Sequence, residues 1–227
     1  MENKKQCIII GGGYSIKEGI NKGLWEKIKG LDVWSLNFAY LAMPYLPTRQ
    51  LWVDISFFNN NIDSLQKLNQ QGVPMYAKLH SRYSIIKEIQ TFGTTRERRY
   101  YTGKKGIEKN VLYIGRMGSV GIFALSLAVA EGYTDIYALG YDFGRVDPIV
   151  DKTHFYEGEL QVISSGVGRP QIYLNKDVHI RREVEDFDAF KKEKDINIYN
   201  VSPLSKITSF PKVTYDEFFG KVKNVQM

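Results

Sequence analysis

Short apolar runs alternate with helical stretches along most of the chain, and this alternation constrains the possible folds more than any other feature. The runs predicted as buried strands are residues 6–10, 32–36, 51–55, 74–79, 111–114, 135–139 and 195–200. The spacing of apolar residues predicts helices over residues 16–28, 62–70, 119–131 and 215–222. Buried strands that alternate with helices are typical of a parallel sheet with helices on both faces. We therefore predict one α/β, Rossmann-like domain over residues 1–227, with a mostly parallel sheet.

Two stretches lack this periodicity. Residues 91–109 contain the basic run TTRERRYYTGKKG, and residues 143–178 are polar and rich in glycine. Long irregular segments in a compact domain are usually lids or binding loops, or else disordered. We predict that residues 143–178 form a lid-like insertion. Cations beside tyrosines can bind single-stranded nucleic acid, but a solvated run of charge is the commoner outcome, so nucleic acid is not an expected partner.

The composition of the chain indicates its cellular compartment and the kind of partner to expect. The single cysteine, Cys7, cannot form an internal disulfide, which favours a reducing compartment. The longest apolar stretch, around residues 120–130, is too short for a membrane span. A net charge of +6 indicates anionic partners such as nucleotides, phosphates, a membrane surface or nucleic acid, without choosing among them. We expect a cytoplasmic protein, and the sequence leaves open peripheral association with the inner membrane face and a homo-oligomeric state.

A glycine-rich turn follows the first predicted strand and precedes the first predicted helix. It has the sequence Gly11-Gly12-Gly13-Tyr14-Ser15. Glycines allow the backbone to approach a phosphate, and a helix N-terminus supplies free N–H groups and partial positive charge. The dinucleotide-binding fingerprint would require a glycine three positions after Gly13, where this chain has Ile16, so the turn is not the NAD motif. A tight turn without a ligand is the alternative.

A second run of small residues begins the buried helix predicted at residues 119–131. Its residues Gly118, Ser119 and Gly121 could hold an anion on backbone N–H groups. The alternative is a serine N-cap, with Gly121 allowing close packing of the helix.

Polar side chains follow three of the predicted strands. Asn37 follows the second strand, Asp54 lies near the end of the third, and Asp142 follows the strand at residues 135–139. Ligands of open α/β sheets bind at the carboxyl ends of the strands, so Asp142 is well placed for a ribose or an acceptor hydroxyl. A polar residue at a strand end can also be a turn former. Three such ends around one glycine-rich turn favour a shared cleft.

His154 is the candidate general base. It lies in DKTHFYEGE, inside the predicted lid, where it could close over the cleft. The other two histidines, His80 and His179, show no supporting pattern, and a surface position for His154 is the alternative. The sequence has no Cys/His cluster, so no metal site is expected.

In this order, the segments resemble the family-42 bacterial sialyltransferases and the related motility-associated flagellin glycosyltransferases. Their wider clan includes a 6-hydroxymethylpterin pyrophosphokinase. The matching segments are IIIGGGYSIKE, VWSLNFAY, WVDISFF, INIYNVSPLSKI and, longest and most specific, GSVGIFALSLAVAEGYTDIYALGYDF. Three departures stand out: Tyr14 replaces a proline, Gly12 replaces an asparagine that touches the donor, and the predicted lid holds one histidine where the family has two.

The resemblance implies a transferase that uses a nucleotide sugar, with a CMP-sugar favoured, and a glycan or related hydroxyl acceptor. It implies no tightly bound cofactor, with His154 as base. Asp142 is the second candidate catalytic residue, because of its place after a strand. The implied nucleotide-binding residues are Gly11, Gly13, Ser15, Asn37, Ser119 and Gly121. Two alternatives stay open. One is a pyrophosphokinase with ATP and Mg²⁺ held by Asp54 and Asp142. The other is a non-catalytic nucleotide- or nucleic-acid-binding protein.

Overall fold

The fold is built on one largely parallel sheet. The computed structural model describes residues 5–78, 89–94, 104–105, 112–114, 119–142, 155, 196–203, 205 and 207–223. The strands are β1 (Gln6–Ile10), β2 (Val33–Leu36), β3 (Arg49–Trp52), β4 (Met75–Lys78), β5 (Ile89–Thr94), β6 (Lys104–Lys105), β7 (Leu112–Ile114), β8 (Asp135–Leu139) and β9 (Asn197–Val201). Their order in the sheet is β6-β7-β5-β4-β3-β2-β1-β8-β9. Each described pair is parallel except β6 with β7 at the edge.

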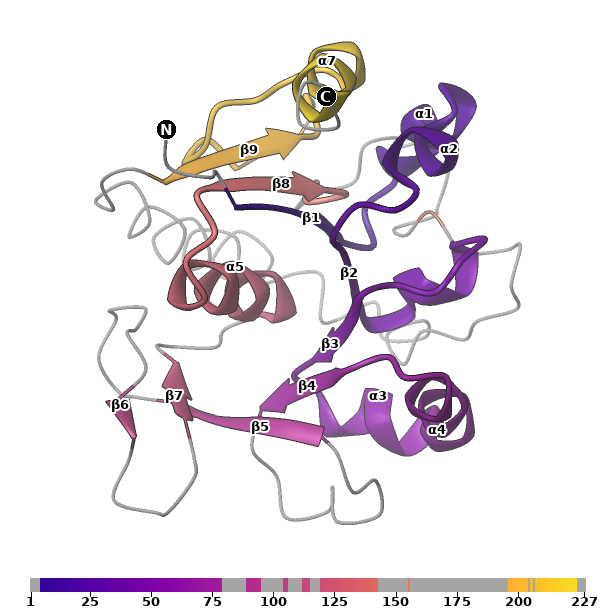
Figure 1. The fold of residues 1–227 in the computed structure, drawn as a ribbon, viewed down its shortest axis with the longest axis vertical. Helices are drawn as coiled ribbons and strands as arrows, with labels where there is room; N and C mark the ends of the chain where they lie inside the picture. The colour runs from indigo at the N-terminus through magenta and orange to yellow at the C-terminus, as the bar shows by residue number, and fades with distance from the viewer. Residues whose placement is uncertain are drawn as a thin grey trace, which may run out of the picture.

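Helices cover both faces of the sheet, as the sequence predicts (Figure 1). The described helices are α1 (Ile16–Asn21), α2 (Leu24–Ile28), the 3₁₀ helix η1 (Asn37–Ala42), α3 (Ile55–Asn60), α4 (Ile62–Gln70), α5 (Val120–Ala130) and α7 (Tyr215–Lys223). Successive side chains of a strand point to opposite faces. Accordingly, Cys7 and Ile9 of β1 pack in the core on the α5 side, and Ile8 and Ile10 pack with α1, α2 and α7.

Helix α5 is apolar on all sides because it is enclosed. Its residues from Gly121 to Ala128 are all buried, and its core contacts include strand residues from β1, β2, β3 and β8. A helix without a polar face is stable only in such a position. It begins at the N-cap Ser119, and Gly132, with a φ of 78°, follows its C-terminus. On the opposite face, α3 and α4 form a further core cluster with Trp52 and Met75.

Several boundaries differ from the sequence prediction. The helix expected over residues 16–28 is two helices, because Gly23 between them has a φ of 78°. Ile20, near the end of the first helix, is exposed. The third strand begins at Arg49, two residues earlier than predicted, and ends before Asp54. Residues 91–94 and 104–105, expected to be irregular, belong to β5 and β6. The helices η1 and α3 were not predicted because they are short.

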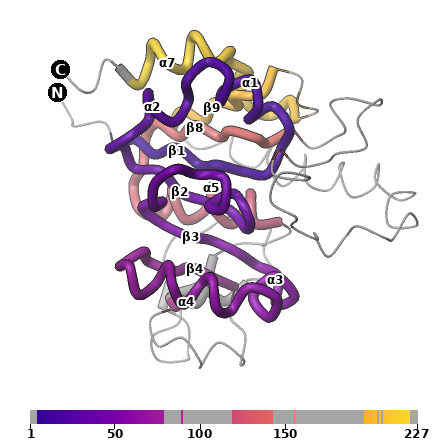
Figure 2. The backbone as a smooth tube through the Cα atoms, turned by 90° about the vertical axis from the view of Figure 1, so that its right-hand side faces the viewer, coloured from indigo at the N-terminus to yellow at the C-terminus, as the bar shows by residue number. Residues whose placement is uncertain are grey.

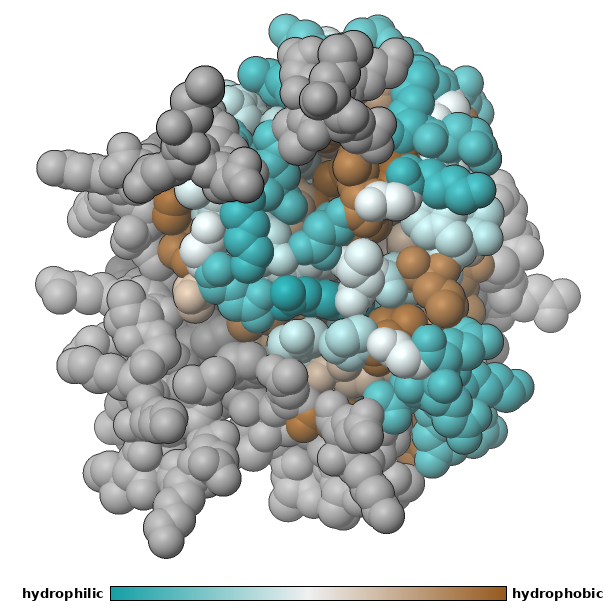
Figure 3. All heavy atoms as spheres, in the orientation of Figure 1, coloured by the Kyte–Doolittle hydropathy of each residue, from teal (hydrophilic) through white to brown (hydrophobic). Residues whose placement is uncertain are grey.

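On the face seen in Figure 3, the described residues are mainly hydrophilic, with hydrophobic residues in smaller patches. None of the described helices has both the length and the apolar character needed to cross a membrane.

Candidate functional site

Strands that follow one another in the sequence are added to one side of β1 first and then to its other side. From β1 the chain builds outward through β2, β3, β4 and β5, and it then returns to place β8 and β9 on the other side of β1. The carboxyl ends of β1 and β8 lie at one edge of the sheet, on the right in Figure 2. In open α/β sheets, ligands bind in the crevice outside the strand ends at such a switch point. The turns that follow β1 and β8 are therefore the first place to look for a site.

These two turns are joined by hydrogen bonds. The N–H of Gly11 donates to the carbonyl oxygen of Leu139 at 2.7 Å, and the N–H of Gly13 donates to that of Gly140 at 2.9 Å. A β-carbon on Gly13 would lie 2.5 Å from both the Gly140 oxygen and Cγ of Asp142. A β-carbon on Gly11 would lie 2.8 Å from the Gly140 oxygen. The close approach of the two turns therefore explains why residues 11 and 13 are both glycines.

Asp142 holds the start of α1. Its carboxylate is buried and accepts hydrogen bonds from the backbone N–H of Ser15 at 2.8 Å and from the Ser15 hydroxyl at 2.5 Å. Ser202, which follows β9, brings its hydroxyl within hydrogen-bond distance of both Asp142 and Ser15. The N–H at the start of α1 is thus bonded to the chain's own carboxylate. Three of the acceptor positions of the Asp142 carboxylate are therefore taken by the chain's own serines.

Tyr215 packs α7 against α1 beside this cluster. Its ring lies against Gly19, where a β-carbon would overlap it, and its side chain is fully buried. Burial raises the pKa of Tyr215 well above its ordinary value, and the nearby Asp142 charge adds to this effect, so the phenol stays protonated. Its hydroxyl is buried without a hydrogen-bond partner among the described residues.

The N-terminus of α5 contacts the turn after β8 from the face of the sheet opposite to α1. Tyr141 donates from its hydroxyl to the carbonyl oxygen of Gly121 at 3.2 Å. A β-carbon on Gly121 would lie 2.9 Å from the Tyr141 ring, so the glycine permits this contact. Ser119 accepts a hydrogen bond from the N–H of Ile122 at 3.4 Å, as a serine N-cap does. Gly118 lies outside the described residues.

Asn37 follows β2 at the same edge of the sheet. Ile10 of β1 pairs with Ser35, so Asn37 and the glycine-rich turn follow neighbouring strands. Among the described residues, Asn37 is the one non-glycine residue with a positive φ, at 48°. Its carbonyl oxygen accepts a hydrogen bond from the Gln50 side chain at 2.9 Å.

Asp54 is farther away. It is exposed and forms the N-cap of α3, without a hydrogen bond from its side chain to the helix. It follows β3, and two strands, β2 and β1, separate β3 from β8. Three spacings of about 4.8 Å put the ends of β3 and β8 roughly 14 Å apart. The structure therefore does not bring Asp54 and Asp142 together.

His154 and nearly all of the predicted lid lie outside the described residues. Phe155, the neighbour of His154 in the sequence, is described. It is buried, and its N–H donates to the carbonyl oxygen of Gly12 at 3.0 Å. The chain thus returns from β8 to the glycine-rich turn one residue after His154.

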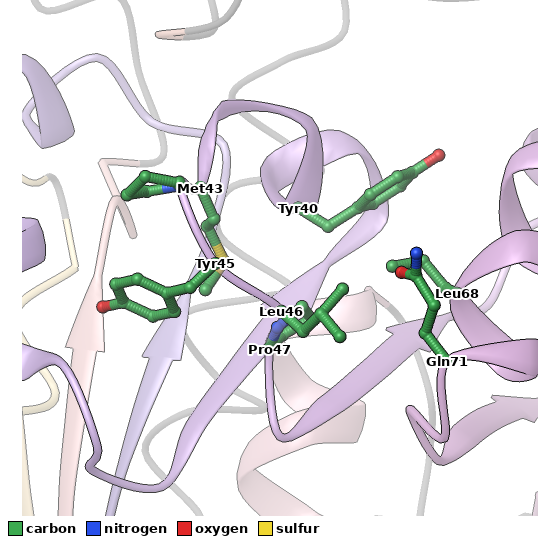
Figure 4. A pocket seen from close by; sticks show the side chains of 8 residues that line it. Tyr40, Met43, Tyr45, Leu46, Pro47, Leu68 and Gln71 are labelled. Carbon is green, nitrogen blue, oxygen red and sulfur yellow. The ribbon is translucent and has the colours of Figure 1, made fainter.

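A separate hollow, with a cavity volume of about 300 Å³, lies between η1, the loop before β3 and α4 (Figure 4). Tyr40, Met43, Leu46 and Leu68 line it, and it contains none of the predicted site residues. Its lining has no charged side chain, so it offers no counterion to a phosphate. Within the described ranges, no group of three or more His, Cys, Asp or Glu residues could hold a metal ion.

Ser202, Tyr215 and Gln50 were not singled out from the sequence. The Ser-Pro turn within INIYNVSPLSKI contains Ser202 and was the available signal for it. No family model matches this sequence, and no curated protein is significantly similar to it.

Proposed function

We propose that the chain is a transferase that uses a nucleotide-activated donor. The favoured form is a sialyltransferase-like glycosyltransferase that acts on a hydroxyl of a glycan or related acceptor. The observation that carries the proposal is the convergence at the β1/β8 switch point. There, a glycine-rich turn and a helix N-terminus with a small-residue start meet from opposite faces of the sheet. This is where open α/β proteins bind nucleotides.

Within this proposal the phosphate binds at the start of α5. The N–H of Ser15 is bonded to Asp142, and a buried carboxylate would repel a second anion at the start of α1. At α5, Ser119 accepts from Ile122, whereas the N–H groups of Val120 and Gly121 donate to none of the described residues. These groups and the positive end of the α5 dipole are suited to a phosphate. Gly12 and Asn37 border the nucleotide along the edge of β1 and β2.

The proposed reaction is a single displacement. His154 removes the proton of the acceptor hydroxyl, whose oxygen forms a bond to the anomeric carbon of the donor sugar. The bond from that carbon to the nucleotide phosphate oxygen breaks in line, and the nucleotide leaves with the electron pair. The N–H groups at the start of α5 stabilise the charge on the leaving phosphate. The position of Phe155 against Gly12 supports this assignment, because it draws the neighbouring residue in the sequence toward the turn.

The pyrophosphokinase alternative is less well supported. It needs carboxylates that share Mg²⁺, whose oxygen ligands lie at about 2.1 Å from the ion. Asp54 and Asp142 follow strands that are separated by β1 and β2, and Asp142 is already bonded to Ser15 and Ser202. A non-catalytic nucleotide-binding protein would share the binding site and differ in lacking turnover.

A thermal-shift screen of the purified full chain tests the proposal. It compares CMP, CDP, UDP, GDP, ATP and CMP-sialic acid, each with and without EDTA. We expect a rise in Tm with a cytidine nucleotide that EDTA does not alter, and slow release of CMP from CMP-sialic acid. A response to ATP that requires Mg²⁺ would favour the pyrophosphokinase. No response to any nucleotide would refute nucleotide use.

A further inference from the structure

Gln50 is a polar residue in the middle of a buried strand. Its side chain is fully buried in β3, between Arg49 and Leu51. Burying an amide costs free energy unless it is hydrogen-bonded. The Gln50 amide nitrogen donates to the carbonyl oxygen of Asn37 at 2.9 Å and, more weakly, to that of Leu51 at 3.4 Å. Because both acceptors are carbonyl oxygens, the nitrogen end of the amide must face them. The stronger bond joins Gln50 to the residue that follows β2.

Asn37 has a backbone conformation that needs support. Its φ of 48° lies in the left-handed region, which costs most residues about 1–2 kcal/mol and is tolerated best by glycine and asparagine. This conformation turns the chain from β2 directly into η1, which begins at Asn37. The bond from Gln50 fixes the carbonyl oxygen of this turning residue from inside the core. Gln50 therefore stabilises the backbone geometry of Asn37.

The side-chain amide of Asn37 takes no part in the bond to Gln50, which uses the backbone oxygen. Asn37 is partly exposed, and its amide nitrogen makes no hydrogen bond with another described residue. Its Oδ1, the Oε1 of Gln50 and the hydroxyl of Ser35, which faces Gln50 across the β2–β3 pair, are buried without a partner among the described residues. Buried polar atoms are rarely left unpaired. No polar group of this cluster accepts a hydrogen bond from the amide nitrogen of Asn37. This arrangement is consistent with an amide donor that binds a ligand.

We infer that Gln50 is a positioning residue for the nucleotide site, holding Asn37 so that its side-chain amide donates to an acceptor oxygen of the nucleotide. The identity of the ligand in this inference rests on the proposed function. The link between Gln50 and Asn37 rests on the structure alone. Gln50 is too deeply buried to touch the nucleotide, so it acts through Asn37.

The first test needs no nucleotide. Gln50→Met keeps the length of the side chain and removes its donor. We expect the Cα and Cβ chemical shifts of Asn37, which report φ and ψ, to leave their left-handed values in the isotope-labelled full chain. Ser35→Ala is the matched control, because it removes a buried polar group opposite Gln50 that has no bond to Asn37. The control should leave the Asn37 shifts unchanged. Left-handed shifts retained in Gln50→Met would overturn the inference. Gln50→Leu replaces Gln50→Met if the latter does not fold.

The second test is a double-mutant cycle read by calorimetric titration with CMP. Asn37→Gly retains the left-handed backbone without the amide. We expect Gln50→Met to weaken CMP binding by roughly tenfold in the natural chain, the worth of about one hydrogen bond, and to have no further effect in Asn37→Gly. Equal losses in both backgrounds would show that Gln50 acts independently of Asn37 and would overturn the inference. If the natural chain binds no CMP, the proposed preference for a cytidine nucleotide fails, and the chemical shifts still decide whether Gln50 holds Asn37.

Discussion

Gly13 and Asp142 lie in such close contact that a β-carbon on residue 13 would be 2.5 Å from the carboxyl carbon of Asp142. These residues belong to the turns after β1 and β8. Their contact sets the distance between the two turns at the switch point. The absence of a side chain at residue 13 is therefore a structural requirement of the proposed site.

Gly13→Ala should separate the two turns. We expect it to lower the free energy of unfolding by about 1–3 kcal/mol through overpacking and to weaken nucleotide binding. Urea denaturation followed by circular dichroism measures the first effect, and titration with CMP the second. Gly220→Ala is the control, because its β-carbon meets open space on α7, and it should raise stability by roughly 0.5–1 kcal/mol. Unchanged stability in Gly13→Ala would contradict the close contact.

Asp142→Asn should destabilise the protein more than Ser202→Ala does. The asparagine keeps the shape of the side chain but brings an NH₂ group toward donors, which leaves the Ser15 N–H or hydroxyl unsatisfied. We expect a loss of about 1–3 kcal/mol in denaturant unfolding. Ser202→Ala removes one of the three donors and should cost less. The reverse order would mean that Asp142 does not brace the turn.

Glu217 should make stability depend on pH at the start of α7. Its carboxylate accepts hydrogen bonds from the N–H and hydroxyl of Thr214, and these bonds hold the pKa of Glu217 below its ordinary value. A lowered folded-state pKa gives stability that is present above the unfolded-state pKa of about 4.3 and is lost as the pH falls through the folded-state value. We predict that Glu217→Gln lowers Tm at pH 7 and that the difference from the natural chain shrinks below about pH 4. A difference that stays constant with pH would exclude this mechanism.

Arg49 should contribute to stability without affecting the proposed site. Its guanidinium lies 4.5 Å from the centre of the Trp34 ring and 2.5 Å from the carboxylate of Glu131, at the amino-terminal end of β3. Arg49→Lys loses both the planar stacking and the fixed fork of donors. We expect a loss of roughly 1–2 kcal/mol in unfolding experiments and an unchanged affinity for CMP. A marked change in CMP affinity would show that the two edges of the sheet are coupled.

His154→Ala tests the proposed chemistry. It should reduce turnover by about 10²-fold or more, the usual contribution of a general base, and should leave nucleotide affinity nearly unchanged. Rates of transfer to a verified acceptor and titration with CMP measure the two effects. Full activity would direct the search for a base to Asp142 or to a carboxylate near His154 in the sequence. Loss of nucleotide binding would assign His154 to the donor site instead.

The sequence predicts well the elements whose signal is local. Strands β1 and β8 and helix α4 have the predicted bounds, because an apolar run or a helical period is bounded by glycine or polar residues. The break after α1 could not be read from the spacing, because Ile16, Leu24 and Ile28 keep the helical period and are buried on both sides of it. Only the left-handed backbone of Gly23 reveals that the helix ends.

The candidate site was predicted in part. The glycine-rich turn, Asn37, Ser119 and Asp142 were identified because each has a recognisable place after a strand or before a helix. The relations among them were not predictable. The bonds of Asp142 to Ser15 and Ser202 join residues 127 and 60 positions apart, and such long-range pairs leave no periodic signal in one sequence.

The reversal of strand order at β1 also determines when during synthesis the site can form. Ser15 must wait for Asp142, 127 residues later, and for Ser202, 187 residues later. A ribosome that adds about 5–20 residues per second needs roughly 6–25 seconds to proceed from Ser15 to Asp142, and the glycine-rich turn lacks this partner during that time. During that time β1 can pair with β2 on one side while its other edge stays open for β8. The central strand of the finished sheet is thus a temporary edge strand in the nascent chain, and pairing of that edge with another chain is the misfolding route this topology has to avoid.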